Sequence, residues 1–158
     1  MKDNIVLIGM PGVGKSTVGV ILAKMIGYQF TDADLLIQKQ EGKLLHEIIA
    51  ENGTDGFIEI EERVNASIEA SHTIIATGGS VVYGKKAMEH LSRIGTVVYL
   101  KVPYDTLEKR LEDIKGRGVV LKEGQTLRTL YDERTPLYEK YADIEISEDV
   151  LNVEQTVE

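Results

Sequence analysis

The sequence of 158 residues contains no cysteine, which excludes disulfide bonds, thiolate nucleophiles and zinc sites with cysteine ligands. No apolar run approaches the ~20 residues that span a bilayer, and the first residues lack the organisation of a signal peptide. The histidines, His46, His72 and His90, are far apart and show no metal-ligand spacing. Repeats, low-complexity tracts and linkers are also lacking. We therefore expect one domain, residues 1–158, in the cytoplasm and without a membrane partner.

Basic residues are scarce, since 18 Lys and Arg stand against 26 Asp and Glu and give a formal net charge of −8. Bulk nucleic-acid binding requires a basic surface that neutralises phosphates, so we expect no nucleic-acid partner. A small basic pocket inside an acidic exterior remains compatible with this charge. The 42% hydrophobic and 28% charged composition is typical of a folded globular chain. We expect this chain to be a monomer.

Strand-like and helix-like segments alternate along the chain. Short apolar runs predict strands, and apolar residues at helical spacing predict helices. The predicted strands are 4–9, 28–31, 73–76, 96–100 and 143–146, and the predicted helices are 15–26, 34–40, 43–51, 53–70, 85–92, 103–114 and 125–141. This alternation predicts a three-layer α/β fold, with a five-stranded parallel sheet covered on both faces. Ligands of such folds bind beyond the carboxyl ends of the strands.

The segment from Gly9 to Ser16 matches the pattern G-x-x-x-x-G-K-[ST] and lies between a predicted strand and a predicted helix. Glycines let backbone N–H groups turn toward phosphate oxygens, and the helix N-terminus adds partial positive charge. Lys15 can reach the outer phosphates, and the Ser16 hydroxyl can ligate Mg²⁺. An ordinary glycine-rich turn is the alternative, but the four fixed positions occur by chance in about one such chain in a hundred. We therefore predict a site for ATP and Mg²⁺ formed by Gly12, Val13, Gly14, Lys15, Ser16 and Thr17.

Beyond this loop, the chain resembles the shikimate kinase family, and several motifs spread over residues 1–146 carry the resemblance. They are Gly19, Leu22, Ala23, Gly27, Phe30, Asp32 and Asp34; Gly42, Glu47 and Ile48; Gly53, Phe57 and Glu61; Thr77-Gly78-Gly79; Arg110 and Arg117; and Arg134-x-Pro136-Leu137-Tyr138. The resemblance implies a P-loop kinase that transfers the γ-phosphoryl group of ATP to a hydroxyl of a small carboxylated metabolite. In that family shikimate becomes shikimate 3-phosphate, a step of aromatic amino acid biosynthesis.

The resemblance also implies roles for residues on the acceptor side. Asp32 lies near the water shell of the magnesium ion, and Asp34 binds substrate hydroxyls and takes the proton of the attacking one. Gly78 and Gly79 allow the backbone to approach the acceptor, and Arg134 binds its carboxylate through two hydrogen bonds. Each role has a plainer alternative: a helix cap for Asp34, a tight turn for the two glycines, and a surface ion pair for Arg134.

A glycine-containing segment, residues 115–124, is predicted to be a mobile lid. By resemblance, this lid closes over the nucleotide and brings Arg117 onto the transferred phosphate, where an arginine offsets developing charge. Arg110 stacks on the adenine in the same comparison. Solvated arginines are the alternative for both positions. Two positions depart from the family pattern: Gly-Val-Val-Leu follows Arg117 where the family usually has a second arginine and a proline, and Ser80 follows Gly78 and Gly79 where the family often has a third glycine.

One further departure bears on the substrate. The family motif after Gly53 is Phe, Arg, two variable residues and Glu, whereas this chain has Phe57, Ile58 and Glu61. The arginine that helps to hold the shikimate carboxylate is thus replaced by Ile58, and Glu61 lacks its usual partner. Loss of one charge-assisted contact costs roughly 1.5–3 kcal/mol, which is about tenfold to a hundredfold in affinity. We include Ile58 and Glu61 among the candidate substrate-binding residues.

Three functions remain open on the sequence alone. The main prediction is phosphorylation of shikimate, with the missing arginine tolerated through Arg134 and Arg117. The second is phosphorylation of another hydroxy acid or of a hydroxy amino acid such as homoserine, whose ammonium Glu61 would meet. The third is a nucleotide-binding module without catalysis. A module without catalysis has no need to keep the candidate site residues together. These residues are Lys15, Ser16, Asp34, Arg117 and Arg134, and their joint presence argues against this third function.

Overall fold

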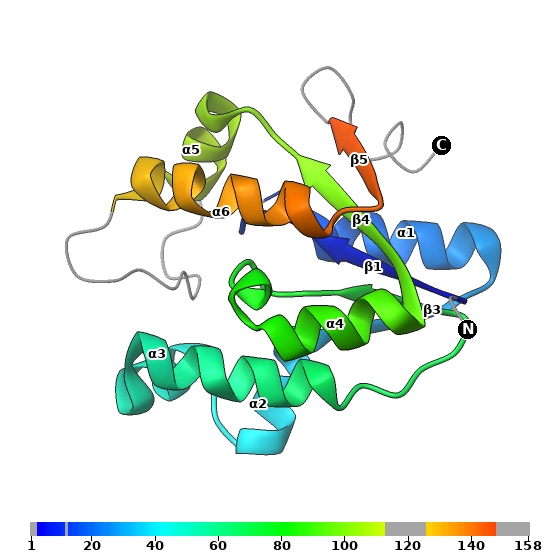
Figure 1. Cartoon of the computed structure of the whole chain (residues 1–158), viewed down its shortest axis with the longest axis horizontal. Helices are drawn as coiled ribbons and strands as arrows, with labels where there is room; N and C mark the ends of the chain where they lie inside the picture. The colour runs from blue at the N-terminus through cyan, green and yellow to red at the C-terminus, as the bar shows by residue number, and fades with distance from the viewer. Residues whose placement is uncertain (1–2, 12, 113–125, 148–158) are drawn as a thin grey trace.

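The structure is a computed structural model that describes residues 3–11, 13–112 and 126–147, with the backbone alone at 110–112 (Figure 1). Its strands form one parallel sheet in the order β2-β3-β1-β4-β5, as the alternation of segments predicts. The strands are β1 (Asn4–Ile8), β2 (Gln29–Asp32), β3 (Thr73–Ala76), β4 (Gly95–Lys101) and β5 (Ile144–Ser147). The central strands are buried on both faces, which is typical of parallel sheets.

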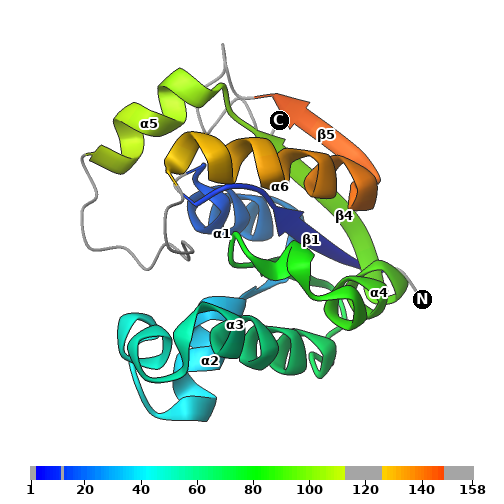
Figure 2. The ribbon, with the colours of Figure 1, turned by 60° about the vertical axis from the view of Figure 1, so that its left-hand side comes forward.

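Helices cover both faces of this sheet, so the predicted three-layer α/β fold is confirmed. They are α1 (Lys15–Ile26), α2 (Ala33–Glu41), α3 (Leu45–Ala66), the 3-10 helix η1 (Val81–Tyr83), α4 (Lys85–Ile94), α5 (Tyr104–Glu112) and α6 (Leu127–Tyr141). α1 lies on one face, and α4 and α6 lie on the other (Figures 1 and 2). The crossover connections of a parallel sheet are right-handed. The chain moves toward one edge of the sheet after β1 and toward the opposite edge after β3, so α1 and α4 must lie on opposite faces.

A second, smaller hydrophobic cluster lies apart from the main core. It consists of Ile37 on α2 with Ile48, Phe57 and Val64 on α3, each at most 2% exposed. This cluster holds α2 and α3 together, beside the sheet rather than upon its central strands (Figure 2). The pair of helices therefore forms a wall with its own packing.

The predicted helices 43–51 and 53–70 form the two arms of α3. They meet at Gly53, whose φ of 73° and ψ of 174° are not helical. The second arm ends at Ala66 rather than at residue 70, because the Ser67 hydroxyl donates to Val64 O and completes the helix end there. None of the helices in the described part of the chain combines the length and apolar character needed to cross a membrane.

Asn4 connects three segments at the amino end of the sheet. Its side-chain Nδ2 donates to Ala70 O at 3.0 Å and to Ile94 O at 2.8 Å, and its Oδ1 accepts from the Thr73 N–H at 3.0 Å. The side chain is buried, so these backbone groups have little access to water as a substitute partner. The amide of Asn4 therefore fixes how β3 and β4 start beside β1.

We predict that Asn4→Ala lowers the free energy of unfolding by about 2–4 kcal/mol, because three backbone groups, of which the Thr73 N–H is buried, lose their partner. Chemical denaturation measures this change. Asn52→Ala is the matched control, since Asn52 is exposed and its side chain makes one bond, to Ile48 O. Equal effects of the two substitutions would contradict the proposed role of Asn4.

Candidate active site

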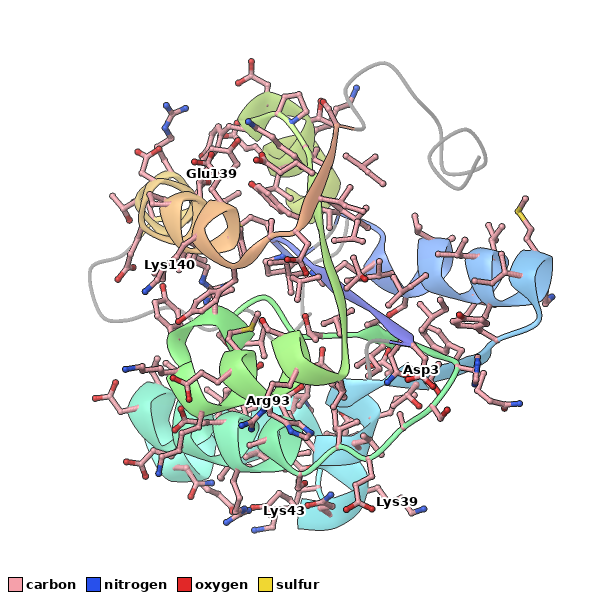
Figure 3. All side chains as sticks on the ribbon, turned by 45° about the vertical axis from the view of Figure 1, so that its right-hand side comes forward. Asp3, Lys39, Lys43, Arg93, Glu139 and Lys140 are labelled. Carbon is pink, nitrogen blue, oxygen red and sulfur yellow. The ribbon has the colours of Figure 1, made fainter. Side chains whose placement is uncertain are left out.

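Charged side chains lie mostly on the outside of the molecule, as Lys39, Arg93 and Glu139 show in Figure 3. Among the described residues, the buried acidic and basic side chains are Lys15, Glu61 and Arg134, and they all line one pocket. Burial of a charge is costly unless it is compensated. Three such groups around one cavity therefore indicate a functional site.

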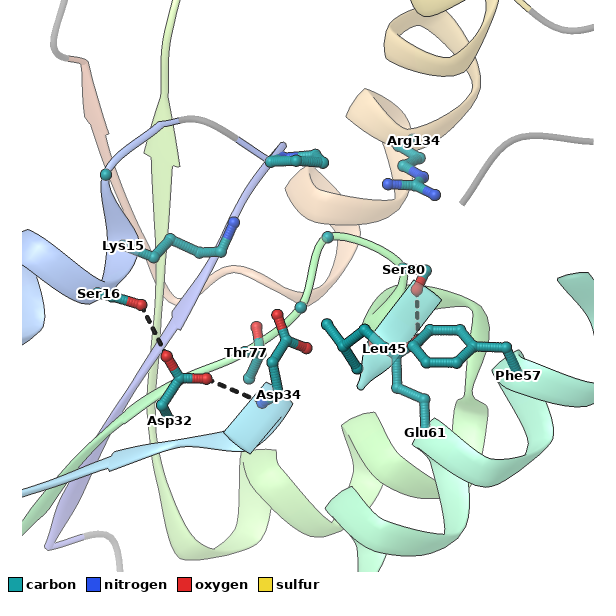
Figure 4. A pocket seen from close by; sticks show the side chains of 14 residues that line it. Lys15, Ser16, Asp32, Asp34, Leu45, Phe57, Glu61, Thr77, Ser80 and Arg134 are labelled. Carbon is teal, nitrogen blue, oxygen red and sulfur yellow. Dashed lines mark hydrogen bonds between the residues drawn. The ribbon is translucent and has the colours of Figure 1, made fainter. Parts of the chain in front are cut away.

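This pocket lies at the carboxyl ends of β1, β2 and β3, where ligand sites of parallel sheets are expected (Figure 4). Its walls come from the phosphate loop, the start of α2, the wall of α3, the loop after β3, and α6. The lining residues are Pro11, Gly14, Lys15, Ser16, Asp32, Asp34, Leu45, Phe57, Glu61, Thr77, Gly78, Gly79, Ser80 and Arg134. The predicted Lys15, Ser16, Asp32, Asp34, Gly78, Gly79 and Arg134 are thus brought together.

The phosphate loop leads directly into α1. Gly14 precedes the helix with a φ of 90°, a left-handed conformation that favours glycine, and no side chain caps the first turn. The first N–H groups of α1 are therefore available to an anion, which the helix dipole also favours. Lys15 is only 8% exposed, and its ammonium donates to Gly9 O at 2.7 Å and to Met10 O at 2.9 Å. Its positive charge is thus held beside this anion site.

Asp32 joins the phosphate loop to the acceptor side. Its Oδ2 accepts from the Ser16 hydroxyl at 3.0 Å, while its Oδ1 accepts from the N–H groups of Asp34 at 2.9 Å and Leu35 at 3.3 Å. Asp32 is therefore the cap of α2. The alternative in which Asp34 caps this helix is wrong, and the carboxylate of Asp34 lines the pocket instead (Figure 4).

The turn after β3 brings two carboxyl groups close together. A Cβ added to Gly78 would lie 2.7 Å from Asp34 Oδ1 and 2.7 Å from Glu61 Oε2, so these oxygens are no farther apart than twice that distance. Only glycine leaves room for both. This close approach accounts for the glycine that the sequence places here.

Glu61 is 1% exposed, and the Ser80 hydroxyl donates to its Oε1. Burial raises the pKa of the Glu61 carboxyl to about 8, and the nearby charge of Asp34 contributes in the same direction. The hydrogen bond from Ser80 and the positive charges of Arg134 and Lys15 oppose this rise in pKa. From the sequence, Ser80 was noted only as a replacement for a glycine. Its hydroxyl group, which can donate a hydrogen bond, was the feature that could have marked it as a partner of Glu61.

Arg134 lies on α6 and faces the same turn. It is 1% exposed, its Nε donates to the Tyr83 hydroxyl at 3.4 Å, and its guanidinium lies 5.3 Å from the centre of the Tyr83 ring. Its terminal nitrogen would lie 2.9 Å from a Cβ on Gly79. The Tyr138 hydroxyl donates to Gly79 O at 2.6 Å and so fixes the turn beneath this arginine. A surface ion pair, the alternative for Arg134, is excluded by its burial.

Several predicted residues are not among those that line the pocket. Ile58 packs against the small cluster of α2 and α3, and it is Phe57 and Glu61 of this helix that line the pocket. Val13 is buried and Thr17 is exposed. Gly12, Arg117 and the predicted lid 115–124 lie outside the described residues, as does the side chain of Arg110.

The pocket thus has an anion-binding loop on one side and, facing it, a carboxylate and a buried arginine (Figure 4). In phosphoryl transfer the loop holds the donor phosphates, while a carboxylate orients the attacking hydroxyl. Fold and site together define a P-loop kinase for small molecules.

Comparisons with known proteins specify the family. The family model for shikimate kinase matches residues 11–158. A shikimate kinase of Clostridium botulinum (strain 657 / Type Ba4) is 43% identical over 143 residues, 87% of this chain and 84% of the relative. The shikimate kinase from Acinetobacter baumannii in complex with shikimate has a TM-score of 0.82 and 34% identity, and the match covers 92% of this chain and 83% of that one. The chain therefore belongs to the shikimate kinase family, and it is an ATP-dependent kinase that acts on a hydroxyl group.

We predict that Gly78→Ala lowers the kcat/KM for the acceptor by about a hundredfold, because the new methyl displaces the carboxylates of Asp34 and Glu61. The KM for ATP should change little, since the phosphate loop is not touched. Steady-state kinetics with each substrate varied in turn measures both effects. An unchanged kcat/KM for the acceptor, in a variant with the wild-type melting temperature, would contradict this role of Gly78.

Proposed function

We propose that this protein phosphorylates shikimate with ATP and forms shikimate 3-phosphate. The observation that carries the proposal is the placement of Asp34 and Arg134 on the two sides of the Gly78–Gly79 turn, facing Lys15 across one pocket. A carboxylate there suits a hydroxyl, and a buried arginine suits an acid group. The membership of the shikimate kinase family supports this choice of acceptor.

In the proposed reaction, the acceptor hydroxyl oxygen attacks the γ-phosphorus of ATP, and the bond from this phosphorus to the β,γ-bridging oxygen breaks. The proton of the hydroxyl passes to the Asp34 carboxylate, and ADP leaves. Lys15 offsets the negative charge on the phosphates, and Arg134 orients the acceptor through its acid group. We retain as proposals, on the family resemblance, that Arg117 acts from a lid, that Arg110 stacks on the adenine and that Gly12, Val13 and Thr17 contact the nucleotide.

A magnesium ion fits the chemistry of the Ser16–Asp32 pair. Both side chains present oxygen atoms, the ligands that Mg²⁺ prefers, and they lie 3.0 Å apart beside the phosphate loop. The described residues contain no group of three acidic, histidine or cysteine side chains that could hold a metal by itself. When bound, Mg²⁺ supplies charge neutralisation on the transferred phosphate; Ser16 would ligate it directly and Asp32 through water.

A second candidate is a hydroxy amino acid such as homoserine. The observation that favours it is Glu61, which has no cationic side chain at position 58 to pair with, since Ile58 packs into the small cluster. The ammonium of such an acceptor would meet Glu61 in its ionised form. We further propose that residues 1–158 act as one domain and as a monomer in the cytoplasm.

We predict that Arg134→Ala raises the KM for the acceptor by about tenfold to a hundredfold, because a charge-assisted contact is lost. The KM for ATP should stay within about threefold of the wild-type value. Arg134→Lys keeps the charge but not the two-pronged geometry, so an intermediate KM is expected. Arg128→Ala is the control, because Arg128 is exposed on the same helix and pairs with Asp132. An acceptor KM that is equal in all these proteins would overturn the assignment of Arg134.

The function is tested by ADP release from Mg-ATP with shikimate, quinate, homoserine, threonine, gluconate or no acceptor. We expect turnover that depends on shikimate and exceeds the turnover without acceptor. Turnover with homoserine or threonine alone would replace the proposal by the second candidate. Nucleotide binding without turnover on any acceptor would favour a non-catalytic nucleotide-binding module.

A further inference from the structure

The two oxygens of the Glu61 carboxyl have different surroundings. Oε1 accepts the hydrogen bond of the Ser80 hydroxyl. Oε2 is buried and finds no hydrogen-bond partner among the described residues. This oxygen lies beside Gly78, in the wall of the acceptor pocket (Figure 4). A buried oxygen without a partner is uncommon, and it requires an explanation.

Charged groups on several elements affect the pKa of Glu61. They are Asp34 on α2, Lys15 on α1 and Arg134 on α6, and Ser80, in the segment after β3, acts through its hydrogen bond. Two tyrosines, Tyr83 after β3 and Tyr138 on α6, lie beside Arg134. α4 meets α3 one residue farther on, where the Lys86 N–H donates to Glu62. The pKa values of both tyrosines are raised above their ordinary value by burial, so neither tyrosine titrates near neutral pH.

Burial raises the pKa of the Glu61 carboxyl to about 8, which favours the neutral acid at this position. The neutral acid carries one proton. In the neutral acid, a Ser80 hydroxyl that donates to Oε1 leaves Oε2 to carry the proton, and Oε2 has no hydrogen-bond partner among the described residues. An ionised Glu61 would instead leave a charged oxygen buried without a hydrogen bond, at high cost. Oε2 is therefore the oxygen from which a neutral Glu61 would donate a hydrogen bond.

We propose that Glu61 binds the acceptor as a neutral acid, donating a hydrogen bond from Oε2 to the acid group that Arg134 also holds. Ser80 is then the positioning residue that directs the proton of Glu61 to Oε2. The inference rests on the proposed function, in that it takes the acceptor to be an anion. It makes Glu61 the residue that selects an anionic group over an ammonium group, because a neutral acid can donate to a carboxylate but cannot pair with a cation.

The proposal sets the sign of a pH effect. Below the pKa of Glu61 the donor is present, and the KM for the acceptor is low. Above it, Glu61 loses the donated proton and places a second negative charge beside Asp34, so the KM for an anionic acceptor rises. For an ammonium-bearing acceptor the sign is opposite, because the ionised form of Glu61 is the one that binds.

The test is the KM for shikimate between about pH 6.5 and pH 9.5, with saturating Mg-ATP. We expect a constant KM at low pH and, above about pH 8, a rise that approaches tenfold per pH unit. Glu61→Gln should abolish the rise of KM with pH, because its amide donates without titrating. Glu59→Gln, an exposed change on the same helix, should keep the wild-type profile.

Ser80→Ala separates this role from a structural one. Its hydrogen bond lowers the pKa of Glu61, so its loss should move the rise in KM to higher pH. A wild-type KM for shikimate that is flat to pH 9.5, or one that falls with pH, would overturn the proposal. A Glu61→Gln variant whose KM for shikimate still rises with pH as in the wild type would also overturn it.

Calorimetry of the wild-type protein keeps the proposal testable if Glu61→Gln does not fold. Shikimate binding near pH 8, measured in two buffers of different ionisation enthalpy, should take up a fraction of a proton. Proton release, or no exchange, would overturn the proposal. If only this proposal about Glu61 fails, shikimate still binds and supports turnover. If the proposed function fails, shikimate neither binds nor supports turnover at any pH.

Discussion

The site depends on one carboxylate that serves two helices. Asp32 caps α2 with one oxygen and accepts the Ser16 hydroxyl of α1 with the other. The start of the helix that follows the phosphate loop and the start of the helix that carries Asp34 are thereby held in one geometry. Since phosphoryl transfer is dominated by positioning, this shared contact determines how the donor and acceptor sides face each other.

The loop after β3 is the second constraint, because it meets every group on the acceptor side. Gly78 leaves room for two carboxyl groups, Gly79 faces Arg134, and Ser80 binds Glu61. At this loop, the buried guanidinium of Arg134 and a neutral Glu61 would together bind the acid group of the acceptor. A neutral Glu61 would repel this group less than an ionised Glu61. Glu61 accepts the hydrogen bond of the Ser80 hydroxyl, whereas Ile58 of the same helix packs against the small cluster of α2 and α3.

The sequence predicted the fold closely, since strong local signals such as the phosphate loop and the apolar strand runs depend little on distant contacts. The sequence motifs also marked Lys15, Asp34 and Arg134, which line one pocket in the structure, while their roles stay predictions. The sequence did not show that Asp32 rather than Asp34 caps α2, because both positions suit a cap. Nor did it show that Ile58 packs into a separate cluster or that Ser80 meets Glu61, since these contacts join residues far apart in the chain.

The separate cluster of Ile37, Ile48, Phe57 and Val64 has a dynamic consequence. Helices with a core of their own can open as one cooperative unit while the sheet stays intact. Phe57 and Glu61 would then leave or enter the pocket together with α3, and the acceptor side would be assembled by a local folding equilibrium. An acceptor that holds Glu61 in place would stabilise the folded form of this unit. The free energy of acceptor binding and the stability of the α2–α3 pair would therefore be coupled.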